Sequence, residues 1–277
     1  MLSFPNCKIN LGLHICDKRE DGFHNITTVF YPVGLRDALE IIPAPHADNA
    51  ITFTASGMVV DGNTDDNTCI KAYHLLKKDF PDLPALQMHL HKTIPMGAGL
   101  GGGSADGAFA LQLLNTKFHL NLSTAALLDY ALQLGSDCPF FIINSPCYAT
   151  GRGEVLEEIA LDLSKYKIVL INPGIHVNTG WAFSQGSGPR NKRGPVPSLK
   201  ELIQQPVATW KETIKNDFEE PVFERYPAIK KIKDDLYARG AVYAAMSGSG
   251  STVFGIFESA IDISIFKNNN YLVTLVD

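Results

Sequence analysis

A run of glycines at residues 97–103 constrains this chain more than any other feature. Five of these seven positions are glycine, in the order Gly-Ala-Gly-Leu-Gly-Gly-Gly, and Ser104 follows directly. Such a run cannot form a packed strand or a stable helix interior, because glycine loses the most entropy on ordering and has no side chain to bury. What it offers is bare backbone N–H groups. The sequence therefore predicts a loop built to present main-chain donors.

The segment after the glycines has the composition of a helix. Residues 105–115 read ADGAFALQLLN, with leucines at helical spacing, and Ser104 stands where an N-cap would be. A glycine-rich loop that opens a helix presents converging N–H donors at the positive end of the helix dipole. This arrangement predicts a phosphate-binding site. A tight structural turn is the alternative, but a turn needs one or two glycines rather than five.

Two familiar phosphate loops do not fit residues 97–105. A Walker loop ends in Gly-Lys-Ser/Thr, whereas this one ends Gly103-Ser104-Ala105 without a lysine. Gly97, Gly99 and Gly102 match the dinucleotide pattern G-x-G-x-x-G, but any glycine-rich run contains that pattern. Its context is also missing, since no strand ending in an acidic residue follows the helix. A dinucleotide oxidoreductase is therefore disfavoured.

Composition narrows the class of protein further. The chain has 277 residues, which is enough for two domains, and its net charge of −5 without a basic block disfavours nucleic acid as a partner. Its five cysteines form no C-x-x-C pair, which fits reduced thiols rather than disulfides or a zinc site. The N-terminus has no apolar signal core, and no run approaches the roughly 18 apolar residues of a membrane span. We expect a soluble cytoplasmic protein that does not bind membranes.

The order of expected elements gives the fold class. Helical patterns cover 67–80, 105–115 and 123–134. Strand patterns cover 5–15, 26–35, 38–42, 50–60, 86–94, 140–143, 146–149, 167–172, 241–245, 253–257 and 271–276. The Gly-, Pro- and Ser-rich segment 184–198 is expected to be a mobile surface loop. Strands first and helices interspersed predict an α+β chain of two domains, 1–159 and 160–277.

Three motifs in this order resemble those of the GHMP kinases. They are the N-terminal Pro5-x-x-Lys8-x-Asn10-Leu11, the glycine-rich loop, and Ser-Gly-Ser-Gly-Ser-Thr at 247–252. The segments DGFH at 21–24, GSDCPFF at 135–141 and NPG at 172–174 are most similar to the branch that phosphorylates 4-diphosphocytidyl-2-C-methyl-D-erythritol. The resemblance implies an N-terminal ATP-binding domain similar to ribosomal protein S5 domain 2 and a C-terminal α/β-plait-like domain.

The resemblance also implies which residues hold ATP. The loop would wrap its phosphates, and two further residues would lie near the nucleotide. The implied set is Pro95, Met96, Gly97, Ala98, Gly99, Leu100, Gly101, Gly102, Gly103, Ser104 and Ala105, with Asn67 and Lys92. Without the resemblance, Asn67 is a helix N-terminal residue and Lys92 an exposed strand lysine. Ser104 has two possible roles, helix cap or hydroxyl ligand to Mg²⁺ held by the phosphates.

Asp137 and Lys8 are the implied catalytic residues. An isolated Asp in a loop is usually a turn or cap residue, but Asp137 matches the family's base, which would accept the proton of the attacking alcohol. Lys8 could be a solvent-facing lysine on an edge strand. However, Asn6 and Asn10 on the same face of that strand are also polar, which favours a site wall. In the family this lysine lies beside the catalytic Asp and keeps the carboxylate ionised.

The remaining implied residues bind the alcohol substrate through its cytosine. His24 would read the edge of the base, Phe23 would stack on its ring, and Phe183 would provide the second aromatic face. Most relatives carry Tyr where this chain has Phe23, so a hydroxyl is lost while stacking is kept. Trp181 could replace Phe183, and core packing is the alternative role for both. Asn10 and Thr179 would complete the substrate-binding set.

These features together predict an ATP-dependent small-molecule kinase with Mg²⁺ as cofactor, acting on the 2-hydroxyl of 4-diphosphocytidyl-2-C-methyl-D-erythritol. We expect a monomer or weak homodimer. One rival is a GHMP kinase for homoserine or a mevalonate derivative, which would lack the Phe23-His24 pair. Another is a non-enzymatic nucleotide binder, which would lack Lys8 or Asp137. This chain has all four residues.

Overall fold

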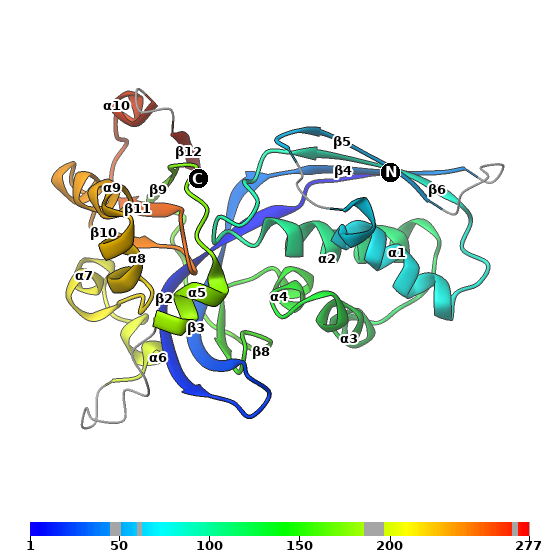
Figure 1. The fold of residues 1–277 in the computed structure, drawn as a ribbon, viewed down its shortest axis with the longest axis horizontal. Coiled ribbons are helices and arrows are strands. Elements are labelled where there is room, and N and C mark those ends of the chain that lie inside the picture. Colours follow the sequence, from blue (N-terminus) through cyan, green and yellow to red (C-terminus); the bar gives the residue numbers. More distant parts are fainter. Residues whose placement is uncertain (45–50, 60–62, 186–196, 268–270, 277) are drawn as a thin grey trace. The chain divides into compact units, whose positions relative to one another are not determined.

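The computed structural model describes residues 1–44, 51–59, 63–185, 197–267 and 271–276. Within these ranges the chain forms two compact units (Figure 1). One comprises residues 1–7, 35–96 and 101–145, and the other residues 8–34, 97–100 and 146–277. The units are thus interleaved along the chain, whereas the sequence predicts a single division between residues 159 and 160. That division stays a prediction.

The first unit is a four-stranded sheet of order β1-β4-β6-β5 with helices on one face (Figure 1). Its elements are β1 (Leu2–Ser3), β4 (Ala38–Pro43), β5 (Ile51–Gly57), η1 (Thr64–Asp66), α1 (Thr68–Asp79), β6 (Leu86–Lys92), α2 (Gly102–Lys117), α3 (Thr124–Leu134) and α4 (Cys138–Ile143). Burial alternates strictly along β6, as expected for a strand with one covered face. β5 runs parallel to β6 because α1 connects them.

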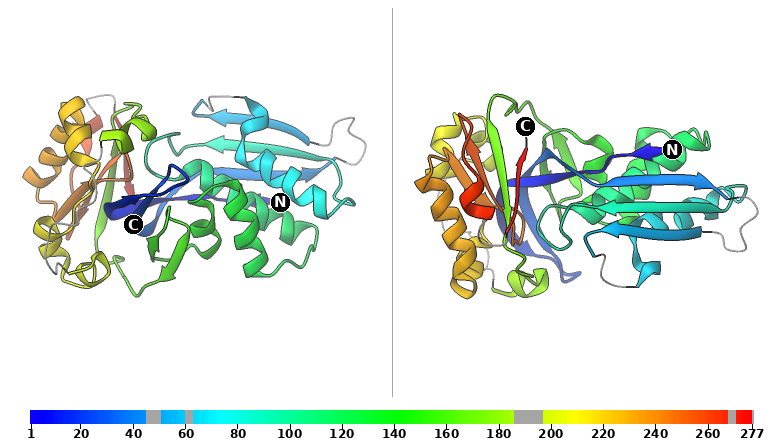
Figure 2. Two further views of the ribbon diagram at one scale, coloured as in Figure 1. Left: turned by 60° about the horizontal axis from the view of Figure 1, so that its bottom comes forward. Right: turned by 90° about the horizontal axis from the view of Figure 1, so that it is seen from above.

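The second unit contains two four-stranded sheets, of order β2-β3-β7-β8 and β10-β11-β9-β12. The strands are β2 (Asn6–Lys18), β3 (His24–Arg36), β7 (Cys147–Thr150), β8 (Val155–Glu158), β9 (Lys167–Asn172), β10 (Tyr243–Met246), β11 (Val253–Phe257) and β12 (Leu272–Val276). The shorter helices are α5 (Thr179–Gln185), α6 (Leu199–Leu202), η2 (Val207–Thr209), α7 (Trp210–Thr213), α8 (Glu219–Arg225) and α10 (Ser264–Lys267). Figure 2 shows the strands from two further sides.

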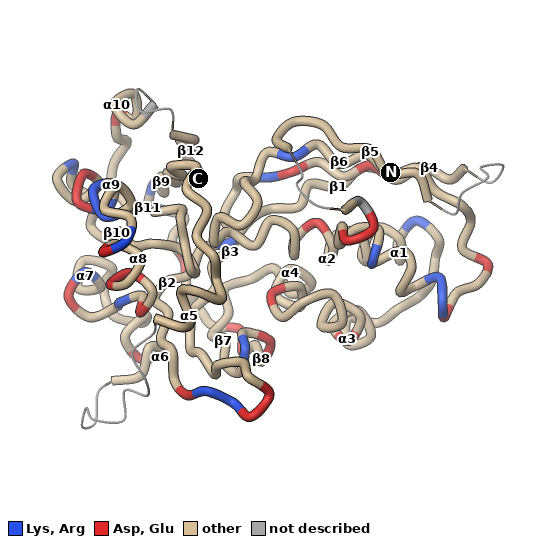
Figure 3. Tube along the Cα trace, in the orientation of Figure 1, with Lys and Arg blue, Asp and Glu red and all other residues tan. Residues whose placement is uncertain are grey.

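The core of the second unit lies between the β9–β12 sheet and helix α9 (Pro227–Ala238). Ile229, Ile232 and Leu236 are at helical spacing on α9 and are almost fully buried against Val253 and Phe257 of β11. The outer face of α9 carries interspersed basic and acidic residues (Figure 3), two pairs of which are ion pairs at i,i+4 spacing. This amphipathic pattern explains why the segment forms a helix over the sheet.

Two local expectations are wrong. Residues 140–143, expected as a strand, belong to helix α4, which starts with Pro139 in its first turn. A short apolar run cannot be assigned to strand or helix by periodicity alone. Helix α2 begins at Gly102 rather than Ala105, and its N-cap is Gly101 in the left-handed region. Ser104 therefore lies inside the first turn and is not the cap.

The other expected elements are found, with ends shifted by a few residues. The expected loop at 184–198 falls largely on residues 186–196, outside the described ranges. No helix within the described ranges is long and apolar enough to cross a bilayer. None of the five cysteines, all in described segments, forms a disulfide. Mixed helix and strand content confirms the α+β class.

Candidate functional site

The glycine-rich loop adopts an alternating backbone conformation. Gly97, Gly99 and Gly101 have φ of 61°, 78° and 70°, whereas Ala98 and Leu100 between them keep negative φ. Residues that alternate between right- and left-handed conformations turn successive N–H groups toward one side, which makes an anion-binding concavity. Only glycine adopts the left-handed region without strain, so this alternation requires glycine at every second position.

The carbonyl groups of residues 98–100 anchor the loop within the second unit. Thr252 N donates to Ala98 O at 3.2 Å, Ser247 Oγ to Gly99 O at 2.8 Å, and Lys8 N to Leu100 O at 3.0 Å. A Cβ on Gly99 would lie 1.9 Å from Ser247 O. The SGSGS turn at 247–251 and β2 thus hold this half of the loop, and Gly99 tolerates no side chain.

The backbone N–H groups of the loop, unlike its carbonyl groups, are not held by hydrogen bonds within the described ranges. No backbone N–H of residues 97–104 donates a hydrogen bond to another group in the described part of the chain. The last of these residues form the first turn of α2, which at 16 residues has a strong N-terminal dipole. Since the carbonyl groups are anchored and the N–H groups are available, the loop is arranged to bind an anion.

Lys92, expected to be exposed, is 1% exposed and lies on the buried face of β6. Its Nζ forms ion pairs with Asp37 Oδ2 and with Asp106 Oδ2, the latter at 2.8 Å. Burial lowers the pKa of Lys92, but the two carboxylates outweigh this and the net shift is upward. Burial also raises the pKa of Asp106 to about 7 despite the nearby ammonium group. The sequence pattern did not predict this cluster of Asp37, Lys92 and Asp106.

Ser104 and Asp137 come from neighbouring helix starts in the first unit. The Ser104 side chain interacts with the thiol of Cys138, the residue that follows Asp137. Burial raises the pKa of that thiol to about 12, so Cys138 stays neutral at physiological pH. Asp137 takes the N-cap position of α4 but makes no capping hydrogen bond with its side chain. Its carboxylate is therefore not committed to the helix end.

Asn67 caps helix α1 and lies close to the start of α2. Its side chain accepts a hydrogen bond from Cys69 N at 2.9 Å. Next to it, Thr68 Oγ1 donates to Gly103 O at 2.6 Å. A Cβ on Gly102 would lie 2.7 Å from Ile94 Cγ2 and 3.0 Å from Lys92 Nζ. The structure thus brings together the expected nucleotide residues that belong to the first unit.

Lys8 is part of a buried polar network in the second unit. Its Nζ donates to Asn10 Oδ1 at 2.5 Å and to Gly99 O at 3.3 Å, and it lies 4.8 Å from the ring of Phe30. Asn10 Nδ2 donates in turn to Thr28 Oγ1 at 2.8 Å. Lys8 is 4% exposed, so it is not a solvent-facing lysine. It lies in the second unit and Asp137 in the first.

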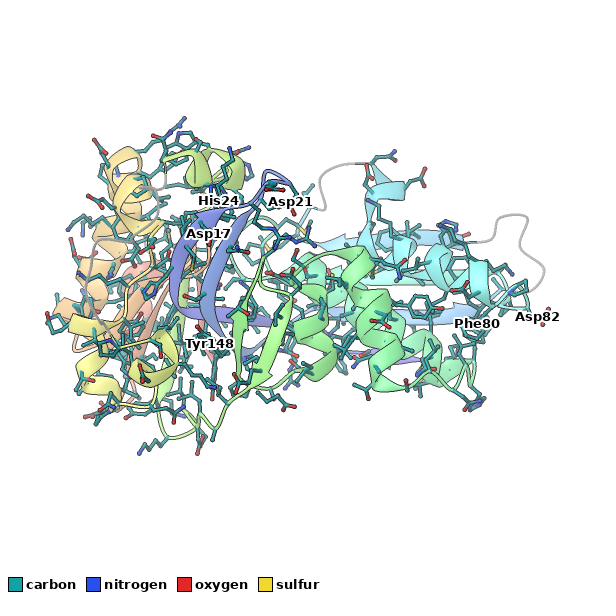
Figure 4. All side chains as sticks on the ribbon, turned by 90° about the horizontal axis from the view of Figure 1, so that it is seen from below. Asp17, Asp21, His24, Phe80, Asp82 and Tyr148 are labelled. Carbon is teal, nitrogen blue, oxygen red and sulfur yellow. The ribbon has the colours of Figure 1, made fainter. Side chains whose placement is uncertain are left out.

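His24 and Phe183 stack on one another, with ring centroids 4.9 Å apart and planes 10° from parallel. His24 begins β3 and Phe183 lies on α5; Figure 4 labels His24 beside the Asp21 loop. Phe23 is 53% exposed, and the guanidinium of Arg152 lies 4.8 Å from the centroid of its ring. Two of the three expected base-binding side chains are therefore in direct contact.

Trp181 occupies a different environment from Phe183. The guanidinium of Arg225 lies 4.4 Å from its ring centroid, and Tyr226 packs edge-on to it at 6.1 Å. Thr179, at the start of the same helix, shares a hydrogen bond of 2.9 Å with Ser249 Oγ in the SGSGS turn. Within α5, Phe183 is thus the aromatic that meets His24.

Comparison with known proteins supports the reading of these motifs. Residues 67–145 match the model of the GHMP kinases N terminal domain, and residues 198–269 match the GHMP kinases C terminal model. A 4-diphosphocytidyl-2-C-methyl-D-erythritol kinase from Bacteroides thetaiotaomicron is 52% identical over 93% of this chain and 92% of its own. One from Pelodictyon phaeoclathratiforme is 38% identical over 91% and 86%.

Solved structures give the same picture. A crystal structure of 4-(cytidine 5'-diphospho)-2C-methyl-D-erythritol kinase has a TM-score of 0.82 at 27% identity and covers 100% of this chain and 99% of its own. A homoserine kinase from Cytophaga hutchinsonii has a TM-score of 0.67 at 14% identity, covering 98% and 94%. The second likeness concerns the fold alone.

Proposed function

Because this chain belongs to the 4-diphosphocytidyl-2-C-methyl-D-erythritol kinases within the GHMP kinase family, we propose that the alcohol it phosphorylates is that compound, at the 2-hydroxyl. ATP is the phosphoryl donor implied by the family. The product would carry a phosphomonoester at C2, and ADP would leave. This is a step in the non-mevalonate route to isoprenoid precursors.

The observation that supports the proposal most is the hydrogen bonding of the loop at 97–104. Its carbonyl groups are anchored while its N–H groups have no acceptor among the described residues. Phosphoryl transfer is catalysed largely by positioning and by stabilising charge on the phosphoryl oxygens. A preformed set of amide donors provides this without reorganisation when ATP binds. The motif family makes ATP, rather than another phosphate compound, the ligand of this loop.

We assign Asp137 the role of general base, which accepts the proton of the attacking hydroxyl. Lys8 would favour the ionised carboxylate and the developing alkoxide through its positive charge. Asn10 would orient the ammonium group, since its Oδ1 accepts from Lys8 Nζ at 2.5 Å. These roles rest on the motif resemblance, and the burial of Lys8 supports them because a desolvated charge acts more strongly than an exposed one.

The base of the substrate would be held by Phe23, His24, Thr179 and Phe183. His24 now stacks directly on Phe183 at 4.9 Å. A base inserted between two rings needs about 7 Å, or two van der Waals contacts. His24 would therefore leave the face of Phe183 when the base stacks there, and its ring nitrogens would then read the base edge. Trp181 is not proposed for this role, because it packs against Arg225 and Tyr226.

Mg²⁺ is the cofactor we propose for the triphosphate. Across the described ranges, no cluster of three or more His, Cys, Asp or Glu side chains could hold a metal ion. This fits a magnesium ion held mainly by phosphates and water, for which one or two protein oxygens suffice. The Ser104 hydroxyl, in the first turn of α2, is the oxygen we assign. When bound, the ion would neutralise charge on the phosphate oxygens.

We also propose a place for two residues, a division into domains, a location in the cell and an oligomeric state. Asn67 and Lys92 belong to the ATP side, the first by capping α1 next to the loop. The domains are 1–159 for ATP and catalysis and 160–277 for substrate. The protein works in the cytoplasm as a monomer or weak homodimer, in keeping with its reduced thiols.

The proposal is tested by following ADP release from Mg-ATP with three acceptors. They are 4-diphosphocytidyl-2-C-methyl-D-erythritol, homoserine and mevalonate. Turnover with the cytidine compound alone is expected. Turnover only with homoserine or mevalonate would move the chain to another branch of the family, and binding of ATP without turnover of any acceptor would favour the non-enzymatic alternative.

A further inference from the structure

The function proposed above places Lys92 on the ATP side but gives no role to Asp37 and Asp106, the buried carboxylates that pair with it. These side chains are 1%, 1% and 2% exposed. A buried ion pair contributes little to stability on balance, because desolvation of the charges offsets their attraction, and apolar replacements are often neutral. Three charged groups in the core of one unit therefore call for an explanation other than stability.

The cluster connects the two ends of the glycine-rich loop. On the entry side, Asp37 Oδ1 accepts from Thr93 N at 2.6 Å and from Ile94 N at 2.8 Å, immediately before Pro95. Lys92 Nζ reaches the other oxygen of the same carboxylate. The entry strand is thus fixed by one side chain that is itself held at the start of β4, where Asp37 N donates to Pro5 O at 2.8 Å.

On the exit side, Lys92 Nζ donates to Asp106 Oδ2 at 2.8 Å. Asp106 lies one turn into α2, and a Cβ added to Gly102 would come within 3.0 Å of the same Nζ. The ammonium group therefore lies directly beneath the first residue of the helix. The other oxygen of Asp106, Oδ1, is buried without a hydrogen-bond partner in the described ranges, so Lys92 is the group that holds this carboxylate.

We propose that Asp37, Lys92 and Asp106 form a clamp that sets the spacing between the strand entering the phosphate loop and the helix leaving it. Lys92 and Asp106 are positioning residues for ATP rather than direct ligands. Lys92 is buried and paired with two carboxylates, so its charge is already neutralised where it lies. Loss of the clamp would let the start of α2 shift relative to Ile94 and spoil the alignment of the amide donors.

The clamp rests on the proposed function, because it acts through the ATP-binding loop. Its test is a double variant, Lys92→Met with Asp106→Leu, which removes one positive and one negative charge. Asp37 keeps the two backbone donors to its Oδ1, Thr93 N and Ile94 N, whereas its Oδ2 loses the ammonium group of Lys92. The matched control is Lys230→Met with Asp234→Leu, the same substitutions in an exposed pair on α9 at 2.6 Å.

The measurement is the Kd of a non-hydrolysable ATP analogue by titration calorimetry, beside the KM of the alcohol substrate. We expect the clamp variant to weaken binding of the ATP analogue at least about tenfold and to change the KM of the alcohol substrate by less than about threefold. The control variant should change neither the Kd of the analogue nor the KM of the alcohol. Analogue binding within threefold of the wild type, or an equal loss for both ligands, would overturn the clamp. Failure of the wild type to bind the analogue would overturn the proposed function and the clamp together.

If the double variant does not fold, two single variants decide the question. Asp106→Asn keeps an oxygen that can accept from Lys92, whereas Asp106→Leu has the same branching but no oxygen. The clamp predicts that Asn at position 106 retains analogue affinity within about threefold and that Leu loses it by about tenfold. Equal affinity of the two variants would contradict a positioning role for this oxygen.

Discussion

The carbonyl oxygen of Gly99 accepts a hydrogen bond of 2.8 Å from the hydroxyl of Ser247, which lies 148 residues further along the chain. A Cβ on Gly99 would come within 1.9 Å of the carbonyl oxygen of the same serine. Two glycine-rich motifs thus fit together at van der Waals limits. Their contact holds the carbonyl groups of the loop in hydrogen bonds, while the N–H groups of residues 97–104 have no acceptor in the described part of the chain.

Replacing Gly99 by Ala is expected to distort the phosphate site. The residue has φ of 78°, and the new methyl group would collide with backbone, which cannot move aside as a side chain can. We expect the KM for ATP to rise by at least about tenfold, with a loss of stability of about 1–3 kcal/mol. Steady-state kinetics and thermal unfolding measure both effects.

Gly240→Ala is the control for this variant. Gly240 has φ of 90° but has no atom within 4 Å of its Cβ position. It should show a similar cost of left-handed backbone, about 1 kcal/mol, without any change in the KM for ATP. If both variants raise the KM for ATP to the same degree, backbone strain alone accounts for the effect and the contact with Ser247 does not matter.

Asp137→Asn is expected to lower kcat by about 10²- to 10⁴-fold, because the amide cannot accept the proton of the attacking hydroxyl. Both KM values should change little, since the amide has nearly the same shape as the carboxylate. Asp129→Asn, on the exposed side of α3, is the control and should keep full activity. An Asp137→Asn enzyme with the wild-type kcat would exclude this residue as the base.

Phe183→Ala is expected to raise the KM for the cytidine substrate by about tenfold or more, as loss of one base-stacking contact of about 1–3 kcal/mol would do. The KM for ATP should stay unchanged. Trp181→Ala provides the comparison, because its ring packs with Arg225 and Tyr226 instead of His24. A larger effect of Trp181→Ala on the substrate KM would reverse the assignment of the stacking residue.

His24→Gln is expected to separate base reading from stacking. Glutamine keeps one donor and one acceptor but lacks the ring that stacks on Phe183 at 4.9 Å. If His24 must leave Phe183 before the base stacks, this variant should bind the cytidine substrate within about threefold of the wild type. Loss of affinity as severe as that of Phe183→Ala would instead indicate that the imidazole ring itself is part of the binding face.

Much of this architecture follows from local sequence pattern. The loop at 97–103 and the helix after it are determined by glycine content and leucine spacing, and the caps of α1 and α3 follow from Asn67 and Ser123. Helix α4 was not predictable, because its six residues from Cys138 to Ile143 are apolar throughout and carry no period.

The burial of Lys92 is indicated by the alternating pattern of its strand, but its charge argues for an exposed position. Leu86, Met88, Leu90 and Lys92 alternate along β6 and share its buried face. The period of two places the lysine inside, but an unpaired buried charge is so costly that an exposed position is the natural expectation. Its partners Asp37 and Asp106 lie 55 and 14 residues away, and no local pattern reveals such pairing.

For Lys8, by contrast, the burial pattern of the strand gives no information about the site. Residues 6–13 of β2 are buried on both faces, so alternation cannot tell which side chains line a site. The polar neighbours Asn6 and Asn10 and the order of the three motifs pointed to Lys8, and the structure adds its contacts with Asn10 and Gly99. Family membership and the α+β fold are confirmed, whereas the roles of individual site residues stay predictions.

The most direct test of the account is ³¹P NMR of the products formed from Mg-ATP and 4-diphosphocytidyl-2-C-methyl-D-erythritol. We expect a new phosphomonoester signal that grows in step with ADP, while the diphosphate signals of the substrate persist, and we expect Asp137→Asn to form this product far more slowly. ADP release without a phosphomonoester on the cytidine compound, or phosphorylation of homoserine or mevalonate instead, would contradict it.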